Sequence, residues 1–377
     1  LQQHGYTTAA IGKWHLGMEF DKKDFSKPIT DGPLQHGFDY YFGISASLDM
    51  PPYVFIENNR FTEIPTVRKQ FPSLMYGKVA KRGPVREGPA APEFEAMDVV
   101  PKLTEKAVGY IDARGQDKKP FFLYLALPSP HTPLVPTREW QGKSGFGPYG
   151  DYVMETDWAV GEVLKAMDRA GLRENTLVIL TSDNGCAAYI GVKELEALGH
   201  YPSAQFRGYK TQIWEGGHRI PFIARWPERI KPGSESDQVV CLTDLMATCA
   251  EILGTKLPDT AGEDSVSILP ALLGTAKAPL REAVVHHSYH GAFAIRQGNW
   301  KLELCQGSGG TALGETDDMS SVQLYDLGAD IAETNNLAAS HPEVVARLTK
   351  LLEECVANGR STPGAKQAND TSIEIRK

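Results

Sequence analysis

The chain has 377 residues, of which 41% are hydrophobic and 23% are charged, a composition typical of soluble globular proteins. This length exceeds what one small core needs, so we expect two domains. The formal net charge of −8 and the lack of any long lysine–arginine run argue against a nucleic-acid partner. No run of 18 apolar residues occurs, so the sequence predicts no membrane span.

The first half of the chain alternates helical and strand patterns. A short buried strand, "AAIGK", is expected at 9–13, and loops with short strands are expected at 20–95. The segment 98–114 has the spacing of a helix, with Val99, Leu103, Ala107, Tyr110 and Ile111 on one face. The apolar run "PFFLYLAL" that follows predicts a strand buried on both faces.

The second half begins with a helix expected at 149–170, and the strand "TLVILT" then leads into a loop. The run "IPFIARWP" predicts another strand, and "TDLMATCAEILG" predicts a helix. Continuous apolar strands alternating with helices predict an α/β fold with a doubly wound sheet and helices on both faces, over residues 1–280. Short strands at 281–338 and a helix at 341–357 predict a smaller α+β domain with an antiparallel sheet, over residues 281–377.

Polar side chains follow three of the predicted strands, and a fourth candidate lies just before another strand. Lys13 and His15 stand in "GKWHLG", His131 follows "FFLYLALPSP", and Lys210 precedes the strand at 220–227. Asp183 and Asn184 follow "TLVILTS" and supply the hard oxygen ligands that suit calcium or magnesium. Because ligands bind beyond the carboxyl ends of parallel strands, we expect these groups at one edge of one sheet.

Each of these motifs also has a purely structural interpretation. "GKWHLG" and "SDNG" fit plain turns, and a loop histidine held by prolines describes His131 equally well. Lys210 has the alternative of a solvated surface lysine. We assign no role to His286 and His287. The cysteines, which are odd in number and lack CxxC pairing, suggest neither a zinc site nor a disulfide framework: Cys186, Cys241, Cys249, Cys305 and Cys355.

Five segments, in order, resemble the formylglycine-dependent sulfatases of the arylsulfatase type. They are "GYTTAAIGKWHLG", "HTPLVP", "TSDNG", "RGYKTQIWEGGHRIPFIARWP" and "QLYDLGADIAETNNLA". The resemblance runs from residue 5 to about residue 350, and the first segment matches a family signature residue for residue. It implies an alkaline phosphatase-like fold and the hydrolysis of sulfate esters.

The resemblance also implies roles for individual residues. Asp183 and Asn184 bind one calcium ion, rather than magnesium, which offsets charge in the transition state. Lys13 and Lys210 hold the sulfate oxygens. His131 protonates the departing oxygen as general acid, and His15 accepts a proton from the sulfated hydrate of formylglycine.

Weaker candidates for substrate binding complete the expected site. "GISASLD" resembles the family segment whose serine contacts sulfate, which makes Ser47 a candidate. His200 and Arg207, from "GHYPSAQFRGYK", are candidates for contact with the sugar or with a second sulfate. The substrate implied is a sulfated sugar or an aryl sulfate ester.

The family's nucleophile is a cysteine or serine in C/S-x-P-S-R, and neither this motif nor the family's upstream aspartate pair occurs here. We therefore expect the chain to be an N-terminally truncated sequence, inactive alone, whose full-length form needs a formylglycine-generating enzyme. An extracytoplasmic location (periplasmic, secreted or lysosome-like) follows from the resemblance only. The alternatives are a phosphatase or phosphodiesterase of the same superfamily, whose two-metal sites need further ligands, and a non-catalytic relative that binds sulfated glycans.

Overall fold

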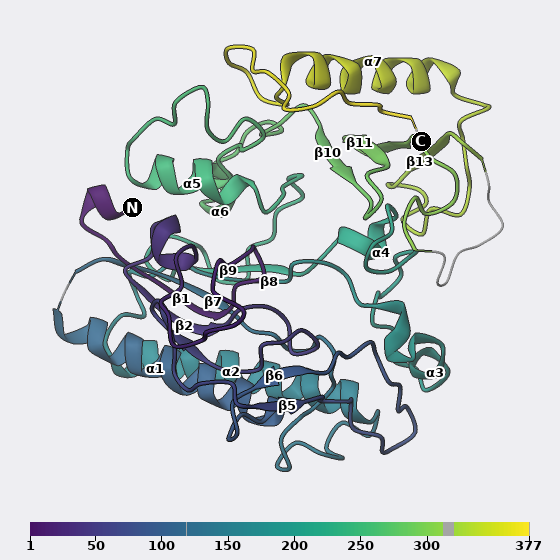
Figure 1. Ribbon diagram of the computed structural model, residues 1–377. Helices are drawn as coiled ribbons and strands as arrows, with labels where there is room; N and C mark the ends of the chain where they lie inside the picture. The colour runs from purple at the N-terminus through teal and green to yellow at the C-terminus, as the bar shows by residue number, and fades with distance from the viewer. Residues whose placement is uncertain (118, 312–319, 377) are drawn as a thin grey trace. The chain divides into compact units, whose positions relative to one another are not determined.

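The computed structural model describes residues 1–117, 119–311 and 320–376 (Figure 1). Two compact units divide the chain. The first unit comprises Leu1–Glu174 and Tyr189–His200, and the second comprises Asn175–Ala188 and Tyr201–Lys377. The domain boundary expected after residue 280 falls within the second unit and remains a prediction.

A mixed five-stranded sheet, in the order β4-β3-β2-β1-β7, forms the centre of the first unit. β1 lies between two parallel neighbours, and its Ala9 and Ile11 are fully buried, as an inner strand requires. The sheet extends antiparallel through β3 and β4. The strands of this unit are β1 (Thr7–Lys13), β2 (Tyr40–Ile44), β3 (Ile56–Glu57), β4 (Arg60–Phe61), β7 (Phe121–Ala126), and a separate antiparallel pair of β5 (Val67–Lys69) and β6 (Gly88–Ala90).

The helices of the first unit confirm the two long helical patterns in the sequence. α1 (Val99–Asp117) and α2 (Pro148–Arg169) run side by side, and α1 also packs against β1 and β2 (Figure 1). Val99, Leu103 and Ala107 are buried along one face of α1, which is the expected apolar stripe. Shorter helices are α3 (Val192–Ala197) and the 3₁₀ turns η1 (Gln2–His4), η2 (Pro33–His36), η3 (Ala96–Asp98) and η4 (Ala188–Ile190), of which η4 extends across the unit boundary.

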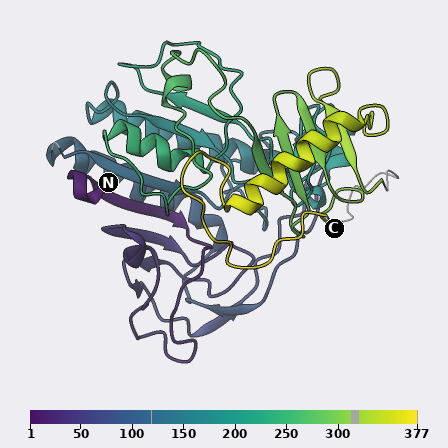
Figure 2. The same cartoon turned by 90° about the horizontal axis from the view of Figure 1, so that it is seen from above.

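A four-stranded antiparallel sheet, in the order β10-β11-β12-β13, confirms the strands predicted at 281–338. The strands are β10 (Val284–His287), β11 (Phe293–Gln297), β12 (Trp300–Glu303) and β13 (Gln323–Asp326); residues 312–319 of the predicted region lie outside the described residues. α7 (Pro342–Asn358) lies across this sheet (Figure 2), with Leu348 and Leu352 in a core shared with Ile295 and Leu302.

The remaining strands pair differently from the single sheet that we expected. β8 (Val178–Thr181) and β9 (Phe222–Arg225) form an antiparallel two-stranded sheet in the second unit. β7 is an edge strand of the described five-stranded sheet, and its Tyr124 is 44% exposed, so it is not buried on both faces. An apolar run predicts that a strand forms, but distant segments decide its partners and its burial. The other helices here are α4 (Glu215–His218), α5 (Asp244–Ile252) and α6 (Leu269–Leu272).

No helix among the described residues has the length and hydropathy needed to cross a bilayer. All five cysteines fall within the described residues and are free thiols, in agreement with the lack of a disulfide pattern in the sequence.

A buried ionic cluster joins α4 to the antiparallel sheet. The Lys301 ammonium, fully buried on β12, lies 2.6 Å from a carboxylate oxygen of Glu333 and 3.1 Å from oxygens of Glu215 and Glu303. Burial alone would raise the pKa of Glu215, but Lys301 outweighs it and lowers that pKa to about 2. Burial raises the pKa of Glu303 well above its usual range, more than Lys301 lowers it. Glu215 therefore stays ionised.

Two buried histidines adjoin this cluster. The rings of His218 and His286 lie 3.8 Å apart between centroids, and His218 Nε2 donates to the Ile213 carbonyl at 2.8 Å. Burial, reinforced by the Lys301 ammonium, lowers the pKa of His218 to about 3. Burial, together with the neighbouring His218, holds the pKa of His286 well below its usual range. Both imidazoles are therefore neutral in the folded protein.

The second unit is expected to lose stability as the pH falls from about 6.5 towards 3. Below the ordinary histidine pKa, these two histidines are protonated in the unfolded chain but neutral in the folded chain. Each of them therefore makes the free energy of unfolding fall by about 1.4 kcal/mol for each pH unit of acidification. Glu215, whose pKa is lowered in the fold, acts in the same direction below about 4.5. Glu303, whose pKa is raised, offsets part of the loss.

Urea unfolding between pH 7.5 and 4, followed by the fluorescence of the buried Trp214, measures this slope. The His218→Gln variant should flatten it, whereas His287→Gln, at the exposed neighbour of His286, should leave it unchanged. Equal slopes in both variants would contradict the assignment.

Candidate active site

Lys13 and His15 stand at the carboxyl end of β1, as the sequence predicted. His15 is exposed and has a left-handed backbone (φ 60°), and its N–H donates to the Ser45 carbonyl at 3.0 Å. The Oγ of the buried Ser47 and the Nδ1 of His15 are hydrogen-bonded at 3.2 Å. The structure therefore brings together His15 and Ser47, two residues that lie 32 positions apart in the sequence.

His131 follows β7 and lies beside a carboxylate that the sequence analysis did not select. Its Nδ1–H donates to the Thr132 carbonyl at 2.7 Å. Asp49 is 4% exposed, and its Oδ1 lies 3.9 Å from His131 Nδ1. A buried negative charge at this distance favours the protonated imidazole, which is the form that a general acid needs.

Asp49 comes two residues after Ser47 in "GISASLD", a segment that the sequence analysis had already selected. Nothing in the sequence, however, pairs Asp49 with His131. Its Oδ1 has no hydrogen-bond partner among the described residues. An ionised group with an unpaired buried oxygen is costly unless a cation lies nearby. The His131 imidazole is the group that lies 3.9 Å from this oxygen.

Asp183 and Asn184 follow β8 in the second unit. The Asp183 side chain is exposed and that of Asn184 is half-buried, with its amide donating to the Gly185 carbonyl at 2.9 Å. The Gly185 N–H donates to the Gly217 carbonyl at 3.0 Å, and a Cβ at Gly185 would overlap the Gly216 carbonyl. The glycine of "SDNG" is therefore required by a close backbone approach, beyond any role in a turn.

Lys210 and Arg207 stand on the segment that packs against this loop. The Lys210 N–H donates to the Cys186 carbonyl at 2.8 Å, which ties the two segments together. The Arg207 guanidinium stacks on the Trp214 ring at 3.7 Å and donates to the Glu333 carbonyl at 2.7 Å. These contacts give Arg207 a structural role, while its contact with substrate remains a prediction.

The predicted site residues thus form two groups, one in each unit. Lys13, His15, Ser47 and His131 belong to the first unit, as does His200, which follows α3 and whose ring lies 5.0 Å from that of Phe146. The second unit contributes its own set: Asp183, Asn184, Arg207 and Lys210.

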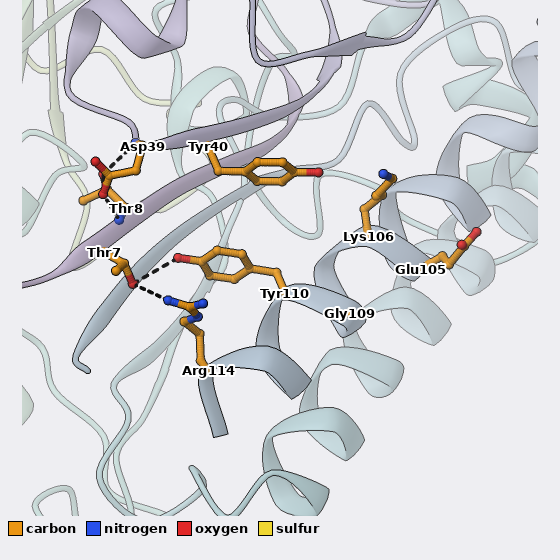
Figure 3. Close-up of a pocket in the computed structure, with 9 residues that line it drawn as sticks. All are labelled: Thr7, Thr8, Asp39, Tyr40, Glu105, Lys106, Gly109, Tyr110 and Arg114. Carbon is orange, nitrogen blue, oxygen red and sulfur yellow. Dashed lines mark hydrogen bonds between the residues drawn. The ribbon is translucent and has the colours of Figure 1, made fainter. Parts of the chain in front are cut away.

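A pocket of ≈ 530 Å³ in the first unit lies at the opposite end of β1 from Lys13 (Figure 3). Its charged groups are already paired, because Arg114 donates to Thr7 at 3.2 Å and Lys106 to Glu57 at 3.1 Å. Ligands of parallel sheets bind at the carboxyl ends of strands, so we assign this pocket no catalytic role. Its lining residues are Thr7, Thr8, Asp39, Tyr40, Glu105, Lys106, Gly109, Tyr110 and Arg114.

Calcium is the metal that the donor atoms of Asp183 and Asn184 fit, because both present hard oxygens. A calcium ion takes six to eight oxygen ligands. Across the described part of the chain no set of three or more His, Cys, Asp or Glu side chains is placed to hold a metal.

Comparison with known proteins shows which family the chain resembles. The family model described as Sulfatase matches residues 1–255, and the model described as N-sulphoglucosamine sulphohydrolase, C-terminal, matches residues 208–358. N-acetylgalactosamine-6-O-sulfatase of Bacteroides thetaiotaomicron is 35% identical, over 94% of this chain and 75% of that protein. Arylsulfatase A of Homo sapiens is 32% identical, over 93% of this chain and 69% of that protein.

Solved structures agree with the sequence relatives. A sulfatase structure from Bacteroides thetaiotaomicron, described with the metabolism of multiple glycosaminoglycans, has a TM-score of 0.80 at 32% identity and covers 94% of this chain and 80% of that one. A sulfatase of Pseudoalteromonas sp. shares the fold, with a TM-score of 0.72 at 24% identity, over 94% of this chain and 71% of that one.

The mixed sheet with its helices and the added antiparallel sheet define an alkaline phosphatase-like fold, and the relatives that share it define a sulfuric ester hydrolase. The chain belongs to the sulfatase family. The predicted fold class and enzyme class are confirmed.

Proposed function

We propose that this sulfatase hydrolyses sulfate esters of carbohydrates, by a formylglycine-dependent reaction, and that a 6-O-sulfated N-acetylgalactosamine is the first substrate to test. Two observations support the proposal. His131 lies beside the buried Asp49 at the end of one strand, and His15 is hydrogen-bonded to Ser47 at the end of its neighbour. The substrate class comes from the relatives named as N-acetylgalactosamine-6-sulfatases.

The chain's own residues divide the work of this reaction. Lys13 and Lys210 bind the sulfate oxygens as fixed positive donors. His131, kept protonated by Asp49, delivers the proton on Nε2 to the departing sugar oxygen, while His15, oriented by Ser47, accepts a proton in the step that releases sulfate. Asp183 and Asn184 hold calcium, which offsets negative charge on the sulfate when it is bound.

The substrate assignment is tested by assaying the full-length protein, co-expressed with a formylglycine-generating enzyme, against sulfated monosaccharides. The panel contains N-acetylgalactosamine 6-sulfate, its 4-sulfate isomer, N-acetylglucosamine 6-sulfate and an aryl sulfate. Preference for the first, measured as kcat/KM, supports the proposal. Turnover of the aryl sulfate alone would contradict the carbohydrate assignment, and hydrolysis of matched phosphate esters alone would favour the phosphatase alternative.

Replacement of Asp183 with alanine is expected to weaken calcium binding at least tenfold, because a charged oxygen ligand is removed from a hard cation. Calorimetric titration of calcium into the chelator-treated protein measures the loss without any need for turnover. Asp237→Ala, which removes an exposed carboxylate of the same unit, is the matched control and should bind calcium normally. Stoichiometric zinc in the purified protein would contradict the assignment.

A further inference from the structure

The segment 207–217 and the loop after β8 form one hydrogen-bonded unit. The Lys210 N–H donates to the Cys186 carbonyl at 2.8 Å, and the Gly185 N–H donates to the Gly217 carbonyl at 3.0 Å. The segment is also closed on itself, because the Gly216 N–H donates to the Arg207 carbonyl at 2.7 Å. A shift of this segment therefore moves Lys210 and the Asp183–Asn184 loop together.

Glu333, which follows β13, holds this segment through three of its own atoms. Its Oε2 accepts the Glu215 N–H at 2.7 Å, and its Oε1 accepts the Lys301 ammonium at 2.6 Å. Its backbone carbonyl accepts the Arg207 guanidinium at 2.7 Å. Both ends of the segment are thus bonded to one residue of the antiparallel-sheet region.

The middle of segment 207–217 has a strained backbone, and residues of the antiparallel-sheet region hold it by hydrogen bonds. Thr211, next to Lys210, has a left-handed backbone (φ 82°), a conformation that is strained for a β-branched residue. The Tyr289 N–H donates to the Thr211 carbonyl at 2.9 Å, and the Thr211 and Thr311 hydroxyls are hydrogen-bonded at 2.7 Å. Such a conformation persists only where its surroundings fix it.

Burial makes these bonds strong. Glu333, Lys301 and Glu215 are all at most 2% exposed, so their charges act in a low-dielectric interior. Burial alone would lower the pKa of Lys301, but Glu333, Glu303 and Glu215 outweigh it and raise that pKa. The ammonium therefore stays charged and keeps Glu333 in place.

We propose that Glu333 is a positioning residue that fixes Lys210 and the Asp183–Asn184 loop for sulfate and metal binding, through the backbone of segment 207–217. Only its consequence for turnover rests on the proposed function. That Glu333 holds segment 207–217 in one conformation follows from the hydrogen bonds, whatever reaction the protein catalyses.

Two variants of equal size separate positioning from general stability. Glu333→Gln leaves one acceptor oxygen where two donors, Lys301 and the Glu215 N–H, need one each, so one donor must face an amide NH₂. Glu303→Gln is the matched control. One carboxyl oxygen of Glu303 lies 3.1 Å from the Lys301 ammonium, and the side-chain oxygen of glutamine can take its place.

Hydrogen exchange of the purified chain gives the first readout. Glu333→Gln should speed exchange at least tenfold for the amides of Gly185, Lys210, Glu215 and Gly216, and leave β11 unchanged. Glu303→Gln should leave these amides as in the parent protein. Equal effects of both variants, or faster exchange throughout the antiparallel sheet, would overturn the proposal and indicate a purely structural cluster.

Kinetics of the full-length enzyme give the second readout. Glu333→Gln should lower kcat/KM for a sulfated sugar at least tenfold, and Glu303→Gln by less than threefold. If neither parent nor variant hydrolyses sulfate esters, the proposed function fails while the exchange result still decides whether Glu333 holds the segment. Unchanged kinetics in Glu333→Gln, with an active parent, would overturn the catalytic consequence.

Discussion

Replacing His131 with alanine is expected to lower kcat for an alkyl sugar sulfate by about 10²–10⁴-fold, because the departing alkoxide is then expelled without a proton. For an aryl sulfate the loss should be below about tenfold, since a phenolate leaves without help. Steady-state kinetics on both substrates, with the full-length enzyme, measure the difference. His36→Ala, at an exposed histidine of the same unit that pairs with Asp31, is the control and should leave both rates unchanged.

Asp49→Asn should give an intermediate loss with a distinct signature. The carboxylate that favours the protonated imidazole is removed while the volume is kept, so the descending limb at high pH in the pH–rate profile should shift to lower pH for the alkyl substrate. Equal losses on alkyl and aryl substrates in His131→Ala would remove His131 from the role of acid, and an unshifted profile in Asp49→Asn would separate Asp49 from His131.

Sequence patterns predicted the long helices well because their signal is local. The stripe from Val99 to Ile111 and the helix expected at 149–170 match α1 and α2 to within three residues at each end. The exits of β1 and β7 were predictable for the same reason, since an apolar run followed by polar residues marks where a strand ends.

Partners between distant segments were not predictable. β8 and β9 each had a clear apolar run, but their antiparallel pairing depends on contacts between segments 40 residues apart. Asp49 carried no mark of function until the fold buried it beside His131. Lys301 sits in "NWKLEL", where alternation predicts a strand but gives no sign that the Glu215 and Glu333 carboxylates from other segments surround it.

The Lys301 cluster leads to the largest stability effect that we expect. Lys301→Met removes the fully buried ammonium that lies 2.6 Å from a Glu333 oxygen and 3.1 Å from a Glu215 oxygen. Glu215 keeps Arg219 at 3.1 Å, and leaving the buried charge of Glu333 uncompensated costs about 3–5 kcal/mol. Urea unfolding at pH 7 measures this loss. Lys350→Met is the matched control, because Lys350 pairs with Glu354 at the surface and such pairs contribute at most about 1 kcal/mol.

The pH dependence distinguishes a lost ion pair from a packing defect. Without Lys301, the pKa of Glu215 in the folded state is expected to rise, because the ammonium is the strongest of the charges that lower it, so the variant should lose less stability than the parent as the pH falls towards 4.5. The parent protein should lose stability over the same range, because His218 and His286 stay neutral in the fold. The slope of stability against pH should therefore be smaller in the variant than in the parent. A variant whose slope matches that of the parent would show that methionine only disturbs packing, and that the carboxylates find other partners when Lys301 is gone.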